Sequence, residues 1–167
     1  MREILFRGKC SETGKWYTGY YINLHKTTYC FKENYDRFKD NDIHQIVFEK
    51  MTDWGLPNQH LRVDVIPETV GQYTGLTDKN GKKIFEGDIV TNEWCFIKGV
   101  SVVKFGHYKT LDMDKDFQQG HLGFYLEHND LINLKSVRRD MMYFANKCEV
   151  IGNIHDNPEL LKERDFN

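Results

Sequence analysis

Residues 75–90 read GLTDKNGKKIFEGDIV, and this stretch decides what kind of fold the sequence can form. Its centre, DKNG at 78–81, predicts a tight turn, because Asn-Gly tolerates the left-handed backbone that a short hairpin requires. The run KKIF at 82–85 forms the return, and EGD at 86–88 predicts a second reversal into a β-branched strand. The glycines match no phosphate-binding pattern. We therefore read the stretch as scaffold that sets strand geometry.

Short runs of aromatic and β-branched residues, separated by Gly, Asn or Asp, recur along the rest of the chain. Such runs favour half-buried strands joined by tight connections. LRVDVI at 61–66 is the clearest case, because its apolar and polar residues alternate with the period of a strand. We expect strands over 2–8, 15–23, 43–49, 61–66, 89–97, 100–106, 123–128 and 148–154, and 27–32 could be another, while the fold of 24–60 as a whole stays open.

The connections between these runs have their own signals. TDWGLPNQ at 52–59 predicts a turn, because Gly55 and Pro57 interrupt regular structure. Lys98-Gly99 predicts a turn between two strands, and the polar run 107–120 predicts a long connection. Residues 33–42 fit a helical turn or a loop. Residues 129–147 fit either a helix or two short strands, and the sequence leaves that choice open.

These elements predict a mainly β fold, β-rich within the α+β class. Segment 84–106 resembles the early strands of an SH3-like barrel, where a Gly-Asp reversal leads into a β-branched strand. Asn157 is a favourable N-cap ahead of a proline, so a short helix should end the chain. We expect an N-terminal β-hairpin region over 1–66, an SH3-like β-barrel over 67–156 and a helical tail over 157–167.

The charge of the chain is nearly balanced, with a net value of −2 over 167 residues. Residues 1–66 hold 10 Lys and Arg against 9 Asp and Glu, and the remainder holds 13 against 16. Neither part offers the broad basic field that drives non-specific nucleic-acid binding. Nucleic-acid binding would therefore have to use a local basic patch.

The cysteines and the apolar runs bear on the compartment. The four cysteines have no C-x-x-C spacing, so they form neither a zinc nor a redox motif. The opening run MREILFRGK has too short an apolar core for a signal peptide, and no stretch approaches the length of a membrane span. We expect a cytoplasmic protein with reduced thiols, without a cofactor and without a membrane partner.

One group of carboxylates has the spacing of a cation loop. Asp112, Asp114 and Asp116 form D-x-D-x-D, which can begin a calcium site. That loop requires Gly at its sixth position and Glu at its twelfth, where this chain has Phe117 and Gly123. We expect a solvated loop and assign no metal ligand.

The seven histidines show neither H-x-H nor H-E-x-x-H spacing. His121 and His128 could converge in space with the aspartates of 112–116, which keeps an enzyme with an unrecognised site as an alternative. His155-Asp156 resembles a base with its orienting carboxylate, but the chain has no nucleophile motif to complete it. We expect Asp156 to help cap the terminal helix, and we assign no catalytic residue.

Lysines and arginines lie near aromatic residues in two parts of the second half of the chain. Small barrels bind nucleic acid through a cationic groove with stacking aromatics. The simpler account makes the aromatics core residues and the lysines the wet faces of strands. The candidate binding surface consists of Trp94, Phe96, Lys98, Lys104, Tyr108, Lys109, Lys135, Arg138 and Arg139.

Several separated blocks of the sequence together resemble the YopX protein family. They are ILFRGKCSETGKWYTGY (4–20), VIPETVGQYTGLTDKNGKKIFEGDIV (65–90), VVKFG (102–106), GFYLE (123–127) and EVIGNIHDNPELL (149–161). The resemblance runs nearly end to end and is thin across 24–60 and 107–120. The resemblance implies a bacteriophage or prophage origin, a β-rich fold with an SH3-like barrel portion, and no catalytic residues that can be carried over.

We therefore expect a non-enzymatic accessory protein that acts through protein contacts in the cytoplasm of a bacterial host. Its partner would be a second copy of itself, as a homo-oligomer, or a host or phage protein. Edge strands of a β-rich fold need cover, and self-assembly is one way to provide it. Two alternatives stay open: a nucleic-acid-binding SH3-like barrel and an enzyme with an unrecognised site.

Overall fold

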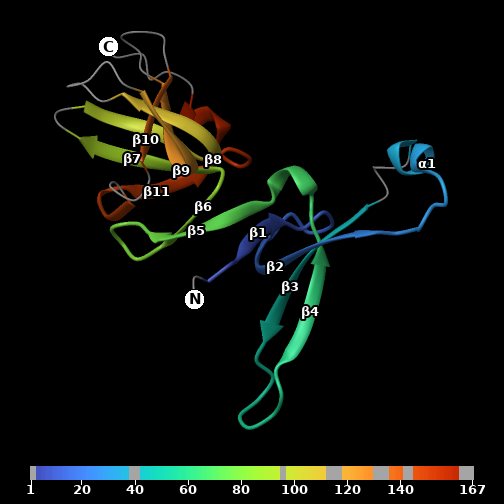
Figure 1. The fold of residues 1–167 in the computed structure, drawn as a ribbon. Coiled ribbons are helices and arrows are strands. Elements are labelled where there is room, and N and C mark those ends of the chain that lie inside the picture. Colours follow the sequence, from blue (N-terminus) through green and yellow to red (C-terminus); the bar gives the residue numbers. More distant parts are fainter. Residues whose placement is uncertain are drawn as a thin grey trace. The chain divides into compact units, whose positions relative to one another are not determined.

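The computed structural model describes residues 3–37, 42–94, 97–111, 118–129, 136–140 and 145–161 (Figure 1). Their strands form two antiparallel sheets, which confirms the prediction of a mainly β fold. The chain divides into two compact units, Glu3–Gln72 and the part from Tyr73 onward. Strand β5 (Gly71–Thr77) runs across this boundary, so its first residues pair with β1 and its later residues pair with β6.

The first unit is a strongly curled antiparallel sheet with one short helix. Its elements are β1 (Phe6–Lys9), β2 (Trp16–His25), α1 (Lys32–Arg37), β3 (Asp42–Lys50), β4 (Gln59–Asp64) and the 3-10 helix η2 (Pro67–Thr69). The strand order is β4-β3-β2-β1, and β1 and β2 form the predicted N-terminal hairpin. A bridge between Cys10 and Val65 joins the end of β1 to the chain just after β4, so the sheet folds back toward its own first strand.

Two strand glycines permit this curl. A Cβ on Gly19 would lie 2.1 Å from the carbonyl oxygen of Val47, and a Cβ on Gly8 would lie 3.0 Å from the Val65 side chain. Glycine in a strand interior marks such close approaches of backbone or side chain. Ile46 is fully buried on the inner face, where aromatic pairs also pack. Those pairs are Phe6–Tyr21, with ring centroids 5.6 Å apart, and Tyr17–Phe48, 5.2 Å apart.

The second unit contains a five-stranded sheet and the strand β6, which pairs with β5 and completes the order β4-β3-β2-β1-β5-β6 of the other sheet. Its elements are β6 (Lys83–Phe85), β7 (Asp88–Trp94), β8 (Ile97–Leu111), β9 (Gln118–Asn129), β10 (Ser136–Asp140), the 3-10 helix η3 (Ala145–Lys147), β11 (Glu149–Asn153) and the 3-10 helix η4 (Pro158–Leu161). The sheet order is β10-β9-β8-β7-β11, and β5 pairs with β6. The core consists of Ile84, Val90, Val103, Leu126, Ala145, Cys148 and Val150.

The predicted SH3-like barrel is not seen as a closed barrel. Over the ranges given above, the five-stranded sheet is open, because β10 pairs with β9 and β11 pairs with β7 at its two ends. The sequence signal behind the prediction is local: it concerns the reversals around β6 and β7, whereas closure depends on pairing between distant strands.

The strand considered at 27–32 is not formed. The pairing of β2 with β3 continues as far as His25 opposite Asp42, so residues 26–41 connect these two strands, and α1 begins at Lys32. TTYCFK has the composition of a strand, but composition does not form one without a neighbour to pair with. For 33–42 the sequence left a helical turn or a loop open, and α1 forms a helical turn over its first part.

Two predicted connections in the second unit are strands instead. Lys98 and Gly99 lie within β8, opposite Glu93 and Asn92 of β7, and do not form a turn. Both ends of the polar run 107–120 are strand, because β8 continues to Leu111 and β9 begins at Gln118. Residues 112–117 lie outside the described residues. Backbone pairing between two long strands does not require an apolar face, so polar composition alone misplaced these ends.

Two predicted segments near the C-terminus, 129–147 and 157–167, lie partly within the described residues. Within 129–147, residues 136–140 form strand β10 and residues 145–147 form a 3-10 turn, which decides against a single helix across the described part. The predicted terminal helix is a 3-10 helix over Pro158–Leu161, and residues 162–167 of the predicted tail lie outside the described residues. The N–H of Leu160 donates to the carbonyl of Asn157, which confirms where this helix starts.

Candidate functional site

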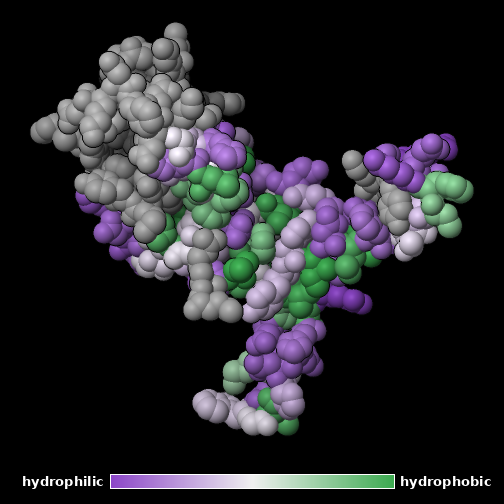
Figure 2. Space-filling view, in the orientation of Figure 1, coloured by the Kyte–Doolittle hydropathy of each residue, from purple (hydrophilic) through white to green (hydrophobic). Residues whose placement is uncertain are grey.

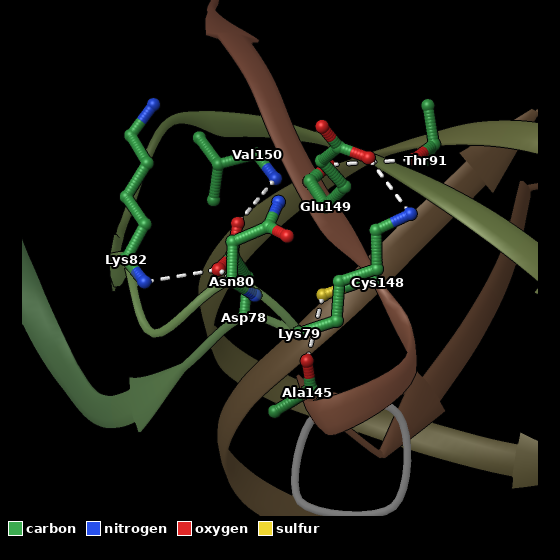
Figure 3. A network of polar contacts seen from close by, with 9 residues as sticks. All are labelled: Asp78, Lys79, Asn80, Lys82, Thr91, Ala145, Cys148, Glu149 and Val150. Atoms are coloured by element: carbon green, nitrogen blue, oxygen red, sulfur yellow. Dashed lines mark hydrogen bonds and ion pairs between the residues drawn. The ribbon is translucent and has the colours of Figure 1, made fainter.

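The stretch 75–90 contains a cluster of polar contacts organised around Asp78 (Figure 3). The side chain of Asp78 is only 4% exposed. Its Oδ1 accepts the N–H groups of Asn80 and Lys82 at 2.8 and 2.9 Å, and its Oδ2 accepts the N–H of Val150 at 3.0 Å. One carboxylate thus closes the turn and fastens it to β11, 72 residues away in sequence.

The environment of Asp78 favours the charged form. Burial alone would raise the pKa of this carboxyl, but the three backbone N–H bonds and the charge of Lys82 outweigh it and lower the pKa below 3.8. Gly81 has a φ of 80°, the left-handed conformation that the Asn-Gly signal predicts. The cluster therefore serves structure: its carboxylate oxygens are occupied by backbone donors that hold the turn in place.

A second aspartate repeats this arrangement ten residues later. Asp88 is buried, and its Oδ2 accepts the N–H of Phe85 at 2.7 Å across the reversal at Gly87, whose φ is 80°. The N–H of Gly87 donates to Val103, and its carbonyl accepts the N–H of Ile154. The reading of 75–90 as scaffold agrees with both turns.

Cys148 lies beside the Asp78 turn and is fully buried. Its Sγ donates to the carbonyl of Ala145 at 3.2 Å (Figure 3). Burial, followed by the charge of Asp78, raises the pKa of this thiol to about 11. A nucleophilic cysteine needs a lowered pKa and access to solvent, so this environment suits a core residue.

This environment predicts a reactivity pattern for the folded protein. Cys148 should resist alkylation at pH 8, because its thiol is buried and its pKa is about 11, whereas the exposed Cys30 should react readily. Mass spectrometry of iodoacetamide-treated native protein, with fully denatured protein as the control, measures this difference. Equal labelling of the two cysteines in native protein would contradict the placement of Cys148.

The structure distributes the predicted binding surface over three strands of the second sheet. Trp94 lies in β7, the residues Lys98, Lys104, Tyr108 and Lys109 lie in β8, and Arg138 and Arg139 lie in β10. Phe96 and Lys135 lie outside the described residues, and so do the side chains of all the others except Lys104 and Tyr108.

The two described side chains are already engaged within the fold. Tyr108 is 5% exposed and stacks on Tyr125 and His121, with ring centroids 5.0 and 5.2 Å apart. Lys104 forms an ion pair with Glu127. Tyr108 is therefore a core aromatic, as the simpler interpretation of the sequence predicted. It is not an exposed platform on which a base could stack.

The sequence analysis considered a cation loop at 112–116 and a convergence of His121 and His128, and assigned neither as a site. Asp112, Asp114 and Asp116 lie outside the described residues, as does the side chain of His128. His121 is one partner in the stack on Tyr108. Among the residues that the structure describes, no three His, Cys, Asp or Glu side chains gather as a metal site would require.

The residues His155 and Asp156 belong to a small turn organised by Asn153. The side-chain oxygen of Asn153 accepts the N–H groups of both residues at 3.0 Å, and its amide donates to the carboxylate of Asp156 at 3.0 Å. Asn157 closes the same turn, because its Oδ1 accepts the N–H of Asn153. These contacts explain the His-Asp pair as part of the end of β11.

The most unusual surface lies in the first unit, where sequence reasoning missed it. Figure 2 shows hydrophobic side chains over the paired strands β2 and β3 and at the tip of the β3–β4 hairpin. Among the described residues of this unit, large hydrophobic side chains are exposed at Ile4, Tyr20, Leu24, Phe31, Met51, Trp54, Leu56 and Leu61. The signal was present in the sequence as a tryptophan inside a Gly- and Pro-containing turn, TDWGLPNQ, which we read only as turn chemistry.

The protein is thus a two-unit antiparallel β protein in which the buried carboxylates of Asp78 and Asp88 organise turns. The chain belongs to the YopX protein family, since the family model described as YopX protein matches residues 5–162. The comparison with curated proteins gives no significant match. Among solved structures, protein EF1440 from Enterococcus faecalis is similar, at 21% identity and a TM-score of 0.44, over 97% of this chain and 100% of that one.

Proposed function

We propose that this YopX-family chain is a non-enzymatic accessory protein, encoded by a phage or prophage, that acts through protein contacts. The observation that carries the proposal is the exposure of large hydrophobic side chains at the tip of the β3–β4 hairpin, at Met51, Trp54 and Leu56, and on β2, at Tyr20 and Leu24. Scattered single residues of this kind are ordinary, but a gathering of them is typical of protein interaction sites. Tyr and Trp, both present here, are among the residues that contribute most to interface energy.

Several finer parts of the proposal rest on the family and the sequence. We propose a phage or prophage origin because the sequence resemblance to the YopX family implies it, and action in the host cytoplasm because of the cysteine pattern and the short apolar runs of the sequence. The SH3-like architecture of 67–156 is part of the same proposal. In the described part of the chain, no helix is long and apolar enough to cross a membrane. The second unit, with its tightly organised turns, would serve as a stable support for the contacts made by the first.

The nucleic-acid alternative has less to support it. Tyr108, the described aromatic of the candidate surface, is buried, and Lys104 is paired with Glu127. The chain as a whole is slightly acidic. Binding to phosphates depends on cations facing the ligand and falls steeply with salt, so this alternative has a simple signature.

The test is affinity purification of the tagged full chain from infected or prophage-induced bacteria, with and without nuclease. We expect a protein partner, either a host or phage protein or untagged copies of this chain, to remain after nuclease treatment. Partners that disappear with nuclease, together with salt-sensitive binding to DNA or RNA, would overturn the proposal in favour of the nucleic-acid alternative. Retention of no partner at all would also overturn it.

A further inference from the structure

The tip of the β3–β4 hairpin, residues 51–58, is an ordered turn that displays a tryptophan. The hydroxyl of Thr52 donates to the carbonyl of Pro57 at 3.0 Å. The N–H of Leu56 donates to the carbonyl of Asp53 at 3.2 Å, and the N–H of Trp54 donates to the carboxylate of Asp53 at 2.7 Å. Trp54 is nevertheless 89% exposed. These bonds fix the loop, so docking Trp54 would require little ordering of its backbone.

A second apolar surface of the same unit lies on the outer face of β2 and β3. We call it the β2–β3 stripe, and it consists of Tyr20, Ile22, Leu24, Ile43 and Val47. The register places Tyr20 opposite Val47 and Leu24 opposite Ile43, and alternate residues of a strand share a face. Tyr20 is 63% exposed, and Leu24 is also exposed. The core residue Ile46 points to the other face.

The charges near these two surfaces favour a protein over a lipid or a nucleic acid. Residues 51–58 contain Asp53 and no Lys or Arg. Binding to an anionic membrane or to phosphates relies on basic side chains beside the apolar ones. On the outer face, the exposed Arg62 lies opposite Val47, next to the β2–β3 stripe. The acidic tip and this arginine have complementary charge.

From this pairing we propose that the partner of the first unit is a second copy of this chain. The hairpin tip of each copy docks on the β2–β3 stripe of the other, with Trp54 against the stripe around Tyr20 and Val47, and with Asp53 facing Arg62. Both surfaces belong to one unit, so a single two-fold axis satisfies both contacts at once and closes the assembly as a dimer. This inference rests on the proposed function and names its partner.

The test measures the mass of the purified full chain by sedimentation equilibrium over about a hundredfold range of concentration. We expect a reversible dimer whose Kd rises at least about tenfold in Trp54→Ala, because a central interface tryptophan carries a large share of the binding energy. Trp54 is exposed, so its removal leaves the fold intact, which thermal unfolding confirms. Leu122→Ala, at an exposed leucine of β9 in the second unit, is the matched control and should leave the Kd unchanged.

A charge reversal tests the geometry of docking. Arg62→Asp should weaken the dimer, because it places a like charge opposite Asp53 of the other copy, whereas Arg62→Lys keeps the charge and should retain most of the affinity. Asp53 itself is left unchanged, because its carboxylate accepts the N–H of Trp54. A Kd that Arg62→Asp leaves unchanged would overturn the proposed pairing.

The remaining outcomes separate this inference from the proposed function. A chain that is monomeric at every concentration, or a dimer that Trp54→Ala leaves unchanged, overturns the reciprocal dimer. If that monomer still retains a nuclease-resistant protein from cells, the proposed function stands without the inference. If it retains none, both fail.

Discussion

Asp78→Ala should destabilise the protein by about 3 kcal/mol or more at pH 7. The substitution leaves three backbone N–H groups, those of Asn80, Lys82 and Val150, without the acceptor that they have in the native fold. Each buried donor left unsatisfied costs about 1–3 kcal/mol, and Asp78 is only 4% exposed. Urea unfolding followed by circular dichroism measures the loss. Peptide-level hydrogen exchange should place it in 73–90 and 149–153.

Two further variants give this prediction its controls. Asp78→Asn keeps one accepting oxygen, so we expect a smaller loss than in Asp78→Ala. Asp156→Ala removes an exposed carboxylate of the same unit, whose contact is with the side chain of Asn153, and should change stability by about 0.5 kcal/mol or less. An Asp78→Ala protein as stable as Asp156→Ala would show that the turn does not depend on the carboxylate.

The lowered pKa of Asp78 adds a pH dependence with a definite sign. Because the pKa of the folded state lies below the usual 3.8, the unfolded chain binds the proton first as the pH falls. The stabilising contribution is therefore complete at neutral pH and is lost below about pH 4. The stability difference between the native chain and Asp78→Asn should shrink over that range. A difference that stays constant down to pH 2 would contradict the assignment.

Gly19→Ala should unfold or severely loosen the first unit, with a cost of about 3 kcal/mol or more. The added Cβ would lie 2.1 Å from the carbonyl oxygen of Val47 and 3.1 Å from the Ile46 side chain. The nearest atom belongs to backbone, so β2 and β3 would have to separate before the methyl group could fit. Hydrogen exchange should increase across β2 and β3, and the β7 and β11 peptides should stay protected.

Gly123→Ala is the matched control for this prediction. Gly123 is also a strand glycine, in β9, but a Cβ there meets nothing within 4 Å. Alanine should be tolerated at this position with a change of about 0.5 kcal/mol or less. Similar losses in the two variants would show that the cost reflects glycine in a strand generally and not the close approach at Val47.

The candidate sites differ in how far the sequence could predict them. The turns around Asp78 and Asp88 were readable, because Asn-Gly and Gly-Asp restrict the backbone within a few residues. Their side-chain roles were not readable, since the acceptor for Val150 lies 72 residues away. The burial of Tyr108 was equally hidden: an aromatic in a polar run can face the core or the solvent, and only the neighbours Tyr125 and His121 decide which.

The exposed hydrophobic residues of the first unit could not be predicted from local sequence patterns either. TDWGLPNQ was identified as a turn, and it is one, but the sequence did not indicate that its own hydrogen bonds would hold Trp54 out in solvent. The β2–β3 stripe was hidden as well, because alternation assigns residues to two faces without saying which face is covered.

The sequence by itself determined the β class, the family, most strand positions and the tight turns, because strand alternation and the backbone limits of Gly, Asn and Asp act over a few neighbouring residues. Tertiary structure decided the rest: where β8 and β9 begin and end, that 27–32 is not a strand, that the second sheet is open over its described strands, and which apolar residues stay exposed. These features depend on pairing and packing between residues far apart in the chain, and no local pattern encodes them.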